Sequence, residues 1–315
     1  MIDLSTGAQP GGVRMRYADA PRGVRDWVER ELGSAVRAVV DCSGGFSPGP
    51  AARVTCASGR RAFVKAVGAE LNADTPGMLR REVDALAAVP THPSIPRVYA
   101  TYDDGDWVAL LLEDVPGAPP RRPWTLEGIQ RVADTIVSLQ EVLDPCPWAD
   151  APLAGEQARP FFDRWRLLVA DPPLDLDPWW RVHLDELGGL ASEAADVVDG
   201  VQLVHWDVRS DNVLLDGRRT VLVDWGQARR GAAWMDPLLV TIDAVLSGAD
   251  LDPDTVRSRL PLVRDAEHHD VARVVCAAAM AWRHTSRSTD VGLPSLRPWQ
   301  RRWADSLTGW LRELV

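Results

Sequence analysis

The residues best suited to chemistry lie in the segment LVHWDVRSDNVLLDGRRTVLVDWGQA, residues 203–228. Asp207 and Asn212 come before an apolar hairpin, and Asp224 follows it. Because strand ends hold side chains rigidly, Asn212 and Asp224 would offer converging oxygen ligands of the kind that Mg²⁺ takes. Asp207 would accept the proton of an attacking hydroxyl group. Asx-turns use the same residue types, so a purely structural loop is the alternative interpretation.

A second group of candidate residues lies upstream and begins with the loop Ser43-Gly44-Gly45-Phe46-Ser47. Its two glycines would let backbone N–H groups approach a phosphate closely, although a plain hairpin turn also uses a glycine pair. Lys65 and Glu82 follow, on an expected strand and an expected helix. A strand lysine paired with a helix carboxylate is an arrangement that holds nucleotide phosphates. Lys65 is also the one lysine among 35 basic residues, which indicates that this position needs a compact ammonium group.

The elements that position these residues fall into two parts. Up to residue 115, short β-rich runs separated by turn residues predict a small sheet, and the apolar spacing over 78–89 predicts a helix within it. After Pro116-Gly117 the pattern becomes helical, and only two short strands interrupt it, at 212–215 and 220–224. The sequence therefore predicts an N-terminal lobe over 1–115 and a helical C-terminal lobe over 116–315. The helices expected in the second part span 125–144, 157–170, 178–199, 232–247, 265–286 and 295–315.

In this order, the motifs resemble those of the aminoglycoside phosphotransferase and choline-kinase-like enzymes, which share the protein-kinase fold. The resemblance runs from the loop at Ser43 to about Leu239 and includes the stretch LLLEDVPG between the two parts. It implies a bilobal α+β protein-kinase-like fold. The N-terminal lobe would be a small antiparallel β-sheet with one helix, and the C-terminal lobe would be larger and mostly helical.

The resemblance also implies a role for each matching residue. Asp207 would be the catalytic base, and Asn212 and Asp224 would be the Mg²⁺ ligands. Lys65 would hold the nucleotide phosphates together with the Ser43–Ser47 loop, and Glu82 would orient Lys65. The nucleotide would be ATP, with GTP as an open alternative.

Other residues near the motifs are expected to support the site. Backbone groups of Glu113 and Val115 would meet the adenine, and His205 and Asp236 would be structural braces. Arg209 has two alternatives, which the sequence leaves open. It would either place a positive charge on the transferring phosphoryl group or pair with a neighbouring carboxylate.

The expected activity is ATP-dependent phosphoryl transfer to a hydroxyl group of a small molecule. A nucleotide-binding pseudokinase or regulatory module is one alternative, although the complete motif set argues against it. A protein kinase is another. It is disfavoured because only 12 residues separate Asp224 from Asp236, too few for a long loop that grips a peptide. Trp225 between Asp224 and Gly226 also fits the phosphotransferases better than protein kinases, which usually have Phe there.

The acceptor is expected to be a hydroxylated small molecule such as an aminoglycoside or other antibiotic, an amino sugar or an amino alcohol. Most of the acidic excess lies after residue 115, which favours a cationic acceptor, unless those carboxylates only cover solvated helix faces. Tryptophans are numerous, 14 in all. They would either line the acceptor cleft or fill the core, and the near-helical spacing of Trp299, Trp303 and Trp310 favours the core.

Composition restricts the remaining partners. A net charge of −10 disfavours nucleic acid and anionic membranes, which need basic surfaces. The first residues show no secretory signal, and the apolar stretches are too short to span a bilayer. Four cysteines without ligand spacing indicate free thiols in the cytoplasm. The protein is expected to be a monomer or a homodimer.

Overall fold

The computed structural model describes residues 14–42, 47–217, 219–264, 266–288 and 296–315. Internal contacts group the chain into two compact units. Of the described residues, the sheet unit contains those up to Pro120 together with Ser210–Ala228, and the helical unit contains Arg121–Arg209 with Arg229–Val315. This grouping places the hairpin that precedes Asp224 in the sheet unit, whereas the boundary expected after residue 115 would place it with the helices.

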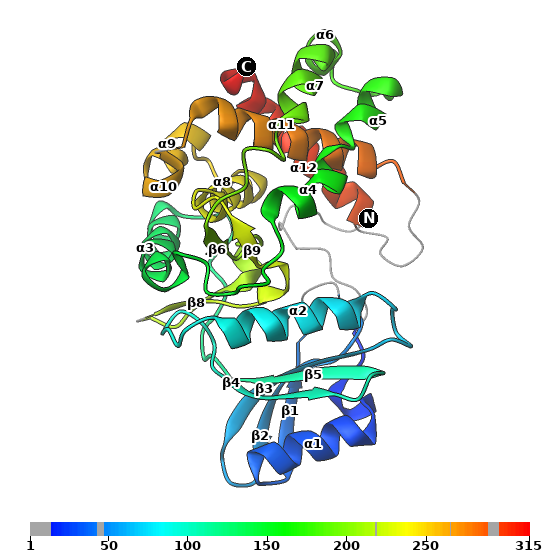
Figure 1. Cartoon of the computed structure of the whole chain (residues 1–315), viewed down its shortest axis with the longest axis vertical. Coiled ribbons are helices and arrows are strands. Elements are labelled where there is room, and N and C mark those ends of the chain that lie inside the picture. Colours follow the sequence, from blue (N-terminus) through cyan, green and yellow to red (C-terminus); the bar gives the residue numbers. More distant parts are fainter. Residues whose placement is uncertain (1–13, 43–46, 218, 265, 289–295) are drawn as a thin grey trace. The chain divides into compact units, whose positions relative to one another are not determined.

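The sheet unit contains a five-stranded antiparallel sheet with the strand order β1-β2-β3-β5-β4 (Figure 1). Helix α1 packs on this sheet through Val24, Trp27, Val28 and Leu32, which are all buried. Strand β5, which lies between β3 and β4, is buried at every position, because α1 and α2 each pack against it. The strands are β1 (Val36–Asp41), β2 (Ala51–Cys56), β3 (Arg61–Gly68), β4 (Val98–Asp103) and β5 (Trp107–Leu112), and the helices are α1 (Arg22–Leu32), α2 (Thr75–Ala88) and the short η2 (Tyr17–Asp19).

A small hairpin, formed by β7 (Val213–Leu215) and β8 (Thr220–Leu222), completes the sheet unit. It is flanked by two single 3₁₀ turns, η3 (Ser210–Asn212) and η4 (Trp225–Gln227). Leu215 bridges to Ala118, and the Leu222 N–H donates to the Ser94 carbonyl at 2.9 Å. The hairpin is therefore tied to the same unit as Lys65.

In the helical unit, α11 (His268–Thr285) forms the centre, and α4, α5, α7 and α12 pack around it. The run Val274–Ala281 of α11 is buried at every position, and its alanines let neighbouring helices approach closely. The other helices are α3 (Leu126–Leu143), α4 (Ala154–Phe162), α5 (Trp165–Ala170), α6 (Pro178–Val182), α7 (Leu184–Ser192), α8 (Met235–Leu246), α9 (Pro253–Ser258), α10 (Pro261–Arg264) and α12 (Leu296–Leu314).

The structure differs from the expected elements in several places, which include the additional short helices α9 and α10. The helix expected over 157–170 is two helices, α4 and α5; Pro160 lacks the N–H that a helix interior uses, and α4 ends two residues after it. The helix expected over 178–199 is divided into α6 and α7. Two further strands, β6 (Gln202–Val204) and β9 (Arg229–Gly231), form an antiparallel pair; at three residues each, they are too short to show a periodic pattern.

The tryptophans of α12 belong to the core. Trp299, Trp303 and Trp310 are 8%, 8% and 2% exposed, and the rings of Trp299 and Trp303 lie 3.8 Å apart between centroids. The helical spacing of these three residues therefore marks a buried helix face. Among the described residues, none of the helices combines the length and apolar composition needed to cross a bilayer.

Candidate active site

Lys65 lies on β3 in the middle of the sheet, where it is paired with Leu110 of β5 and with Ala51 of β2. Its Nζ lies 2.6 Å from Glu82 Oε2 and 2.7 Å from Asp224 Oδ1. Glu82 comes from α2 and is 1% exposed. We call Lys65, Glu82 and Asp224 the Lys65 cluster. The pairing of Lys65 with Glu82 matches the arrangement expected from the sequence.

The cluster keeps its ammonium group charged. Burial lowers the pKa of Lys65, but the nearby carboxylates of Asp224 and Glu82 outweigh burial and raise the pKa above its usual range. Burial raises the pKa of Glu82, and the Lys65 ammonium opposes that change. Two carboxylates around one ammonium leave an excess negative charge at Asp224, whose side chain is 45% exposed. The exposed end of the cluster is therefore suited to bind a cation.

The β7–β8 hairpin places Asn212 and Asp224 at the same end. Val213 is paired with Leu222, and the Val223 N–H donates to the Asn212 carbonyl at 2.9 Å. Asn212 is 6% exposed. Asp224 has a φ of 67°, in the left-handed region that few residues other than glycine adopt. Such strain persists only where the surroundings fix the backbone, and it is common at functional sites.

The two residues that follow Asp224 pack the end of the β7–β8 hairpin against α2. The Trp225 indole is fully buried, and its Nε1 donates to the Leu222 carbonyl at 2.9 Å. The Trp225 backbone N–H donates to the Glu82 carboxylate. At Gly226, a Cβ atom would lie 3.3 Å from the Met78 carbonyl oxygen, closer than most Cβ contacts. The Asp-Trp-Gly sequence thus serves to hold Asp224 and Glu82 together.

The glycine loop is described only at its end. Ser43, Gly44, Gly45 and Phe46 lie outside the described residues. Ser47 is described, and its buried Oγ has no hydrogen-bond partner among the described residues. Residues 48–50 lie against β3: a Cβ on Gly49 would come within 1.9 Å of the Ala66 carbonyl oxygen, and the Ala66 N–H donates to Pro50 at 3.0 Å. This close approach requires glycine at position 49.

Arg14 is a residue that the sequence analysis missed. Its guanidinium Nη1 donates to the Gly49 carbonyl at 3.1 Å, beside the end of the glycine loop. Burial lowers the pKa of Arg14, and the Asp224 carboxylate is the strongest charge that opposes this effect. Arg14 therefore brings a second positive charge toward the Lys65 cluster. Nothing in the sequence distinguishes it from the other arginines, because its placement depends on how the N-terminal segment folds back.

The connector residues Glu113 and Val115 follow β5 directly. The Glu113 N–H donates to the Arg97 carbonyl at 2.8 Å, and its side chain pairs with Arg219 and Arg97. Val115 is 3% exposed. The Glu113 side chain is thus occupied by structural ion pairs, and only its backbone carbonyl suits the expected role toward an adenine.

In the helical unit, the segment from His205 to Arg209 forms what we call the Asp207 loop. The Asp236 carboxylate accepts the His205 and Trp206 backbone N–H groups at 2.8 Å each. Asp236 lies in the first turn of α8 and is 5% exposed. Burial raises the pKa of Asp236 to about 6, against the opposing effect of these two hydrogen bonds. The position of Asp236 matches that of the brace expected from the sequence.

Trp206 has the strained backbone conformation in this loop. Its φ of 65° is in the left-handed region, which is rare for a bulky residue. The Arg229 guanidinium of β9 lies 4.6 Å from the Trp206 ring centroid. Because β9 pairs with β6 immediately before the loop, the short β6–β9 ladder that the sequence analysis missed supports Trp206.

His205 and Arg209 surround Asp207. His205 is fully buried, and its Nδ1 accepts the Asp207 N–H at 3.3 Å. The Arg209 Nε lies 3.4 Å from Asp207 Oδ1. The free protein therefore has the carboxylate contact of one alternative for Arg209, and contact with the transferring phosphoryl group stays a prediction. The Asp207 side chain is 26% exposed, so solvent reaches it.

The chain matches the model of a known protein family. The model of the phosphotransferase enzyme family, APH, matches residues 42–253. This range includes Lys65, Glu82, Asp207, Asn212 and Asp224. A search of curated proteins found no match to the sequence.

Solved structures share the fold. An aminoglycoside phosphotransferase from Alicyclobacillus acidocaldarius is 17% identical, with a TM-score of 0.56, covering 89% of this chain and 91% of that chain. The choline kinase LicA from Streptococcus pneumoniae is 14% identical, with a TM-score of 0.62, covering 91% and 98%. A spectinomycin phosphotransferase in complex with ADP and spectinomycin is 10% identical, with a TM-score of 0.56, covering 93% and 98%. These likenesses confirm the predicted α+β protein-kinase-like fold.

Proposed function

Because the chain belongs to the phosphotransferase enzyme family, we propose that it transfers the γ-phosphoryl group of ATP to a hydroxyl group of a small molecule. The observation that carries this proposal is the Lys65 cluster, in which one buried ammonium is held between Glu82 and Asp224. The ADP bound to the structurally similar spectinomycin phosphotransferase supports a nucleotide as the donor.

Lys65 would hold the nucleotide phosphates. It stays protonated in the free protein, so it needs no proton uptake before it binds an anion. Glu82 keeps the ammonium in position, because its carboxylate pairs with Lys65 Nζ in addition to the pair between Lys65 and Asp224. Arg14, which binds the Gly49 carbonyl, would add a contact to the phosphates. So would Ser47, whose Oγ has no hydrogen-bond partner among the described residues.

Asn212 and Asp224 fit a magnesium ion. They provide one amide and one carboxylate oxygen at the end of one hairpin, and Mg²⁺ typically takes one or two protein oxygens and completes its shell with phosphates and water. When bound, this ion would neutralise negative charge on the phosphates.

Asp207 would orient the acceptor hydroxyl group and accept its proton. Its backbone N–H donates to His205 Nδ1, and the N–H groups of the two preceding residues donate to the Asp236 carboxylate. These hydrogen bonds fix the backbone that leads to Asp207. In the free protein, Arg209 pairs with Asp207. The ionised carboxylate is the form that can accept a proton. Catalysis of this type depends mainly on positioning and on charge neutralisation.

A screen of acceptors tests the proposal. The purified protein is incubated with γ-labelled ATP and Mg²⁺ and with aminoglycosides, other hydroxylated antibiotics, amino sugars and amino alcohols, and labelled product is detected. We expect transfer to at least one of these classes. If ATP binds but no small molecule is labelled and ATP is not hydrolysed, the chain is a nucleotide-binding module instead. Labelling of a peptide would favour a protein kinase.

A further inference from the structure

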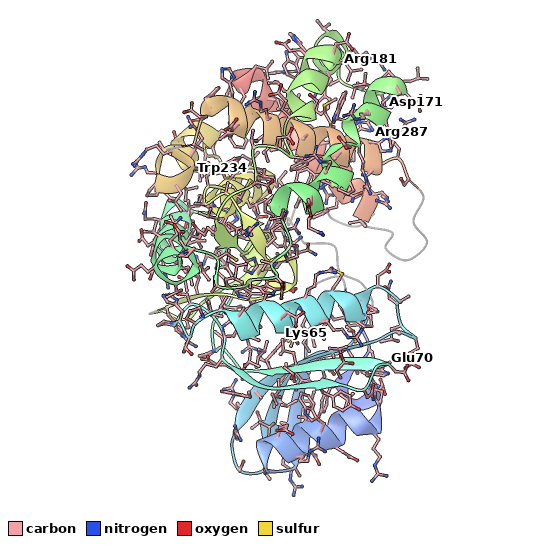
Figure 2. The ribbon with its side chains drawn as sticks, in the orientation of Figure 1. Lys65, Glu70, Asp171, Arg181, Trp234 and Arg287 are labelled. Atoms are coloured by element: carbon pink, nitrogen blue, oxygen red, sulfur yellow. The ribbon has the colours of Figure 1, made fainter. Side chains whose placement is uncertain are left out.

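A pocket lined by arginines lies in the helical unit where α11 ends and α12 begins, beside the segment 171–177 that joins α5 to α6. Its volume is about 430 Å³. Arg287, which lines the pocket, and Asp171 are both labelled in Figure 2, and the Arg287 guanidinium binds the side chain and the backbone carbonyl of Asp171. The polar lining residues are Asp175, Arg283, Ser286, Arg287, Arg297 and Arg301.

The charge of this lining is opposite to that of the whole chain. Four guanidinium groups and one carboxylate face the pocket, whereas the chain has 35 basic and 45 acidic residues. Asp171 and Asp305 pair with Arg287 and Arg301 from outside the lining. Counting both, four guanidinium groups still face three carboxylates. The first turn of the 19-residue helix α12 also lines the pocket, and its dipole adds positive potential.

Arg283 is the buried member of the group. Only 4% of its side chain is exposed, and it pairs with Asp175. Burial lowers the pKa of Arg283, and the positive charge of nearby Arg301 lowers it further. A guanidinium group in such surroundings is stabilised by an anion that it can bind with its planar fork.

Asp175 indicates how an anion binds there. Its carboxylate pairs with both Arg283 and Arg301, the latter at 2.6 Å, yet 64% of the Asp175 side chain is exposed. The hydrogen bond from Arg301 and the charge of Arg283 lower the pKa of Asp175 to about 2. Asp175 thus binds Arg283 and Arg301 from one side, while Asp305 also binds Arg301 and Asp171 binds Arg287. A guanidinium group has five N–H donors, so each of these arginines keeps further N–H groups for an added anion.

We propose that this pocket binds a small anion with carboxylate or phosphate groups, held by Arg283, Arg287 and Arg301 on the open side of Asp175. The proposal does not rest on phosphoryl transfer. The anion has two possible sources: it is either a charged group of the acceptor or a separate ligand.

Citrate is a suitable probe, because it carries several carboxylates and is smaller than the pocket. Titration calorimetry on the full chain without nucleotide should show saturable binding at one site. Arg287→Gln and Arg301→Gln should each weaken binding about 10-fold, since each removes a charged hydrogen-bonding fork. Arg312→Gln is the matched control: Arg312 lies on the same helix and pairs with Asp177 outside the pocket, so binding should change less than about 2-fold.

Asp175→Asn separates a binding site from a structural brace. Removal of the competing negative charge should strengthen citrate binding several-fold if the arginines bind anions. If they only brace the helices, this variant will lower the thermal stability without tighter binding, and the proposal is wrong. Absence of saturable binding, or an equal loss in the Arg312 variant, also overturns it. Lys65→Met should leave citrate binding unchanged, which excludes the Lys65 cluster as the site.

A competition experiment distinguishes the two sources. If citrate raises the KM for an acceptor found in the screen, the pocket recognises an anionic group of that acceptor. If citrate binds without changing transfer, the pocket takes a separate ligand. Both results keep the anion site, and failure to find any acceptor leaves the calorimetric test unaffected.

Discussion

The Lys65 cluster and the Asp207 loop fix their functional side chains by different means. The Lys65 cluster uses charge, because one ammonium lies between two carboxylates at 2.6 and 2.7 Å. The Asp207 loop uses backbone geometry, because the Asp236 carboxylate accepts two N–H groups and holds Trp206 at a positive φ. We therefore expect the function of the Lys65 cluster to depend on the shape of its cationic side chain. We expect the stability of the Asp207 loop to depend on a single hydrogen-bond acceptor, Asp236.

Asp236→Ala should give the largest change in stability. The substitution leaves two buried N–H groups without their acceptor and releases the strained backbone of Trp206, so the free energy of unfolding should fall by about 3 kcal/mol. Urea denaturation measures this change. Asp196→Ala is the control, because Asp196 is an exposed residue of the same unit whose side chain is 65% accessible. Equal effects of the two substitutions would mean that Asp236 is not a brace.

Lys65→Arg tests the cluster by changing shape without changing charge. A planar guanidinium group is too large for the position of an ammonium that touches two carboxylates, so kcat/KM should fall about 100-fold. The protein should remain folded, since the charge that neutralises Glu82 is kept. Steady-state kinetics and thermal unfolding give the two readouts. Full activity of this variant would show that the single lysine of the chain is incidental.

Gly49→Ala tests whether the end of the glycine loop must lie against β3. The added Cβ would overlap the Ala66 carbonyl oxygen, so stability should fall by about 2 kcal/mol and nucleotide affinity should decrease. Gly77→Ala is the matched control, because Gly77 lies in α2 and a Cβ there meets nothing within 4 Å. That substitution should stabilise the protein by about 0.5–1 kcal/mol. Similar results for both variants would contradict the close contact.

The pH dependence of stability gives the smallest effect in this comparison. The pKa of Asp236 is about 6 in the folded protein and 3.8 in the unfolded chain, so the folded state binds the proton more tightly. The resulting stabilisation is complete below pH 3.8 and is lost as the pH rises through 6. Between pH 5 and 7.5, the wild type should lose about 1.4 kcal/mol relative to Asp236→Asn. A difference that stays constant over this range would contradict the raised pKa.

The sequence predicted more of the charged cluster than of the strained loop. Lys65 and Glu82 are close in the chain and have distinct residue types, so their pairing could be foreseen, and the antiparallel hairpin placed Asn212 and Asp224 correctly. No feature of the sequence indicated that Asp224 would also pair with Lys65. That contact spans 159 positions and depends on tertiary packing.

The support of the Asp207 loop was less predictable. The β6–β9 ladder has three residues per strand, too few for a periodic signal, so the contact between Arg229 and Trp206 could not be expected. Arg14 was missed for a similar reason, because one arginine among many carries no local pattern. The motifs formed by residues close in the sequence could thus be predicted, whereas the contacts between residues far apart in the sequence could not.

The proposed phosphoryl transfer is tested most directly with Asp207→Ala. Labelled product is measured with an acceptor from the screen, and ADP affinity is measured on the same preparation by calorimetry. The proposed role of Asp207 predicts that product formation falls below detection while ADP affinity changes less than about 3-fold, because the Lys65 cluster is untouched. Product formation at the wild-type rate by this variant would contradict it.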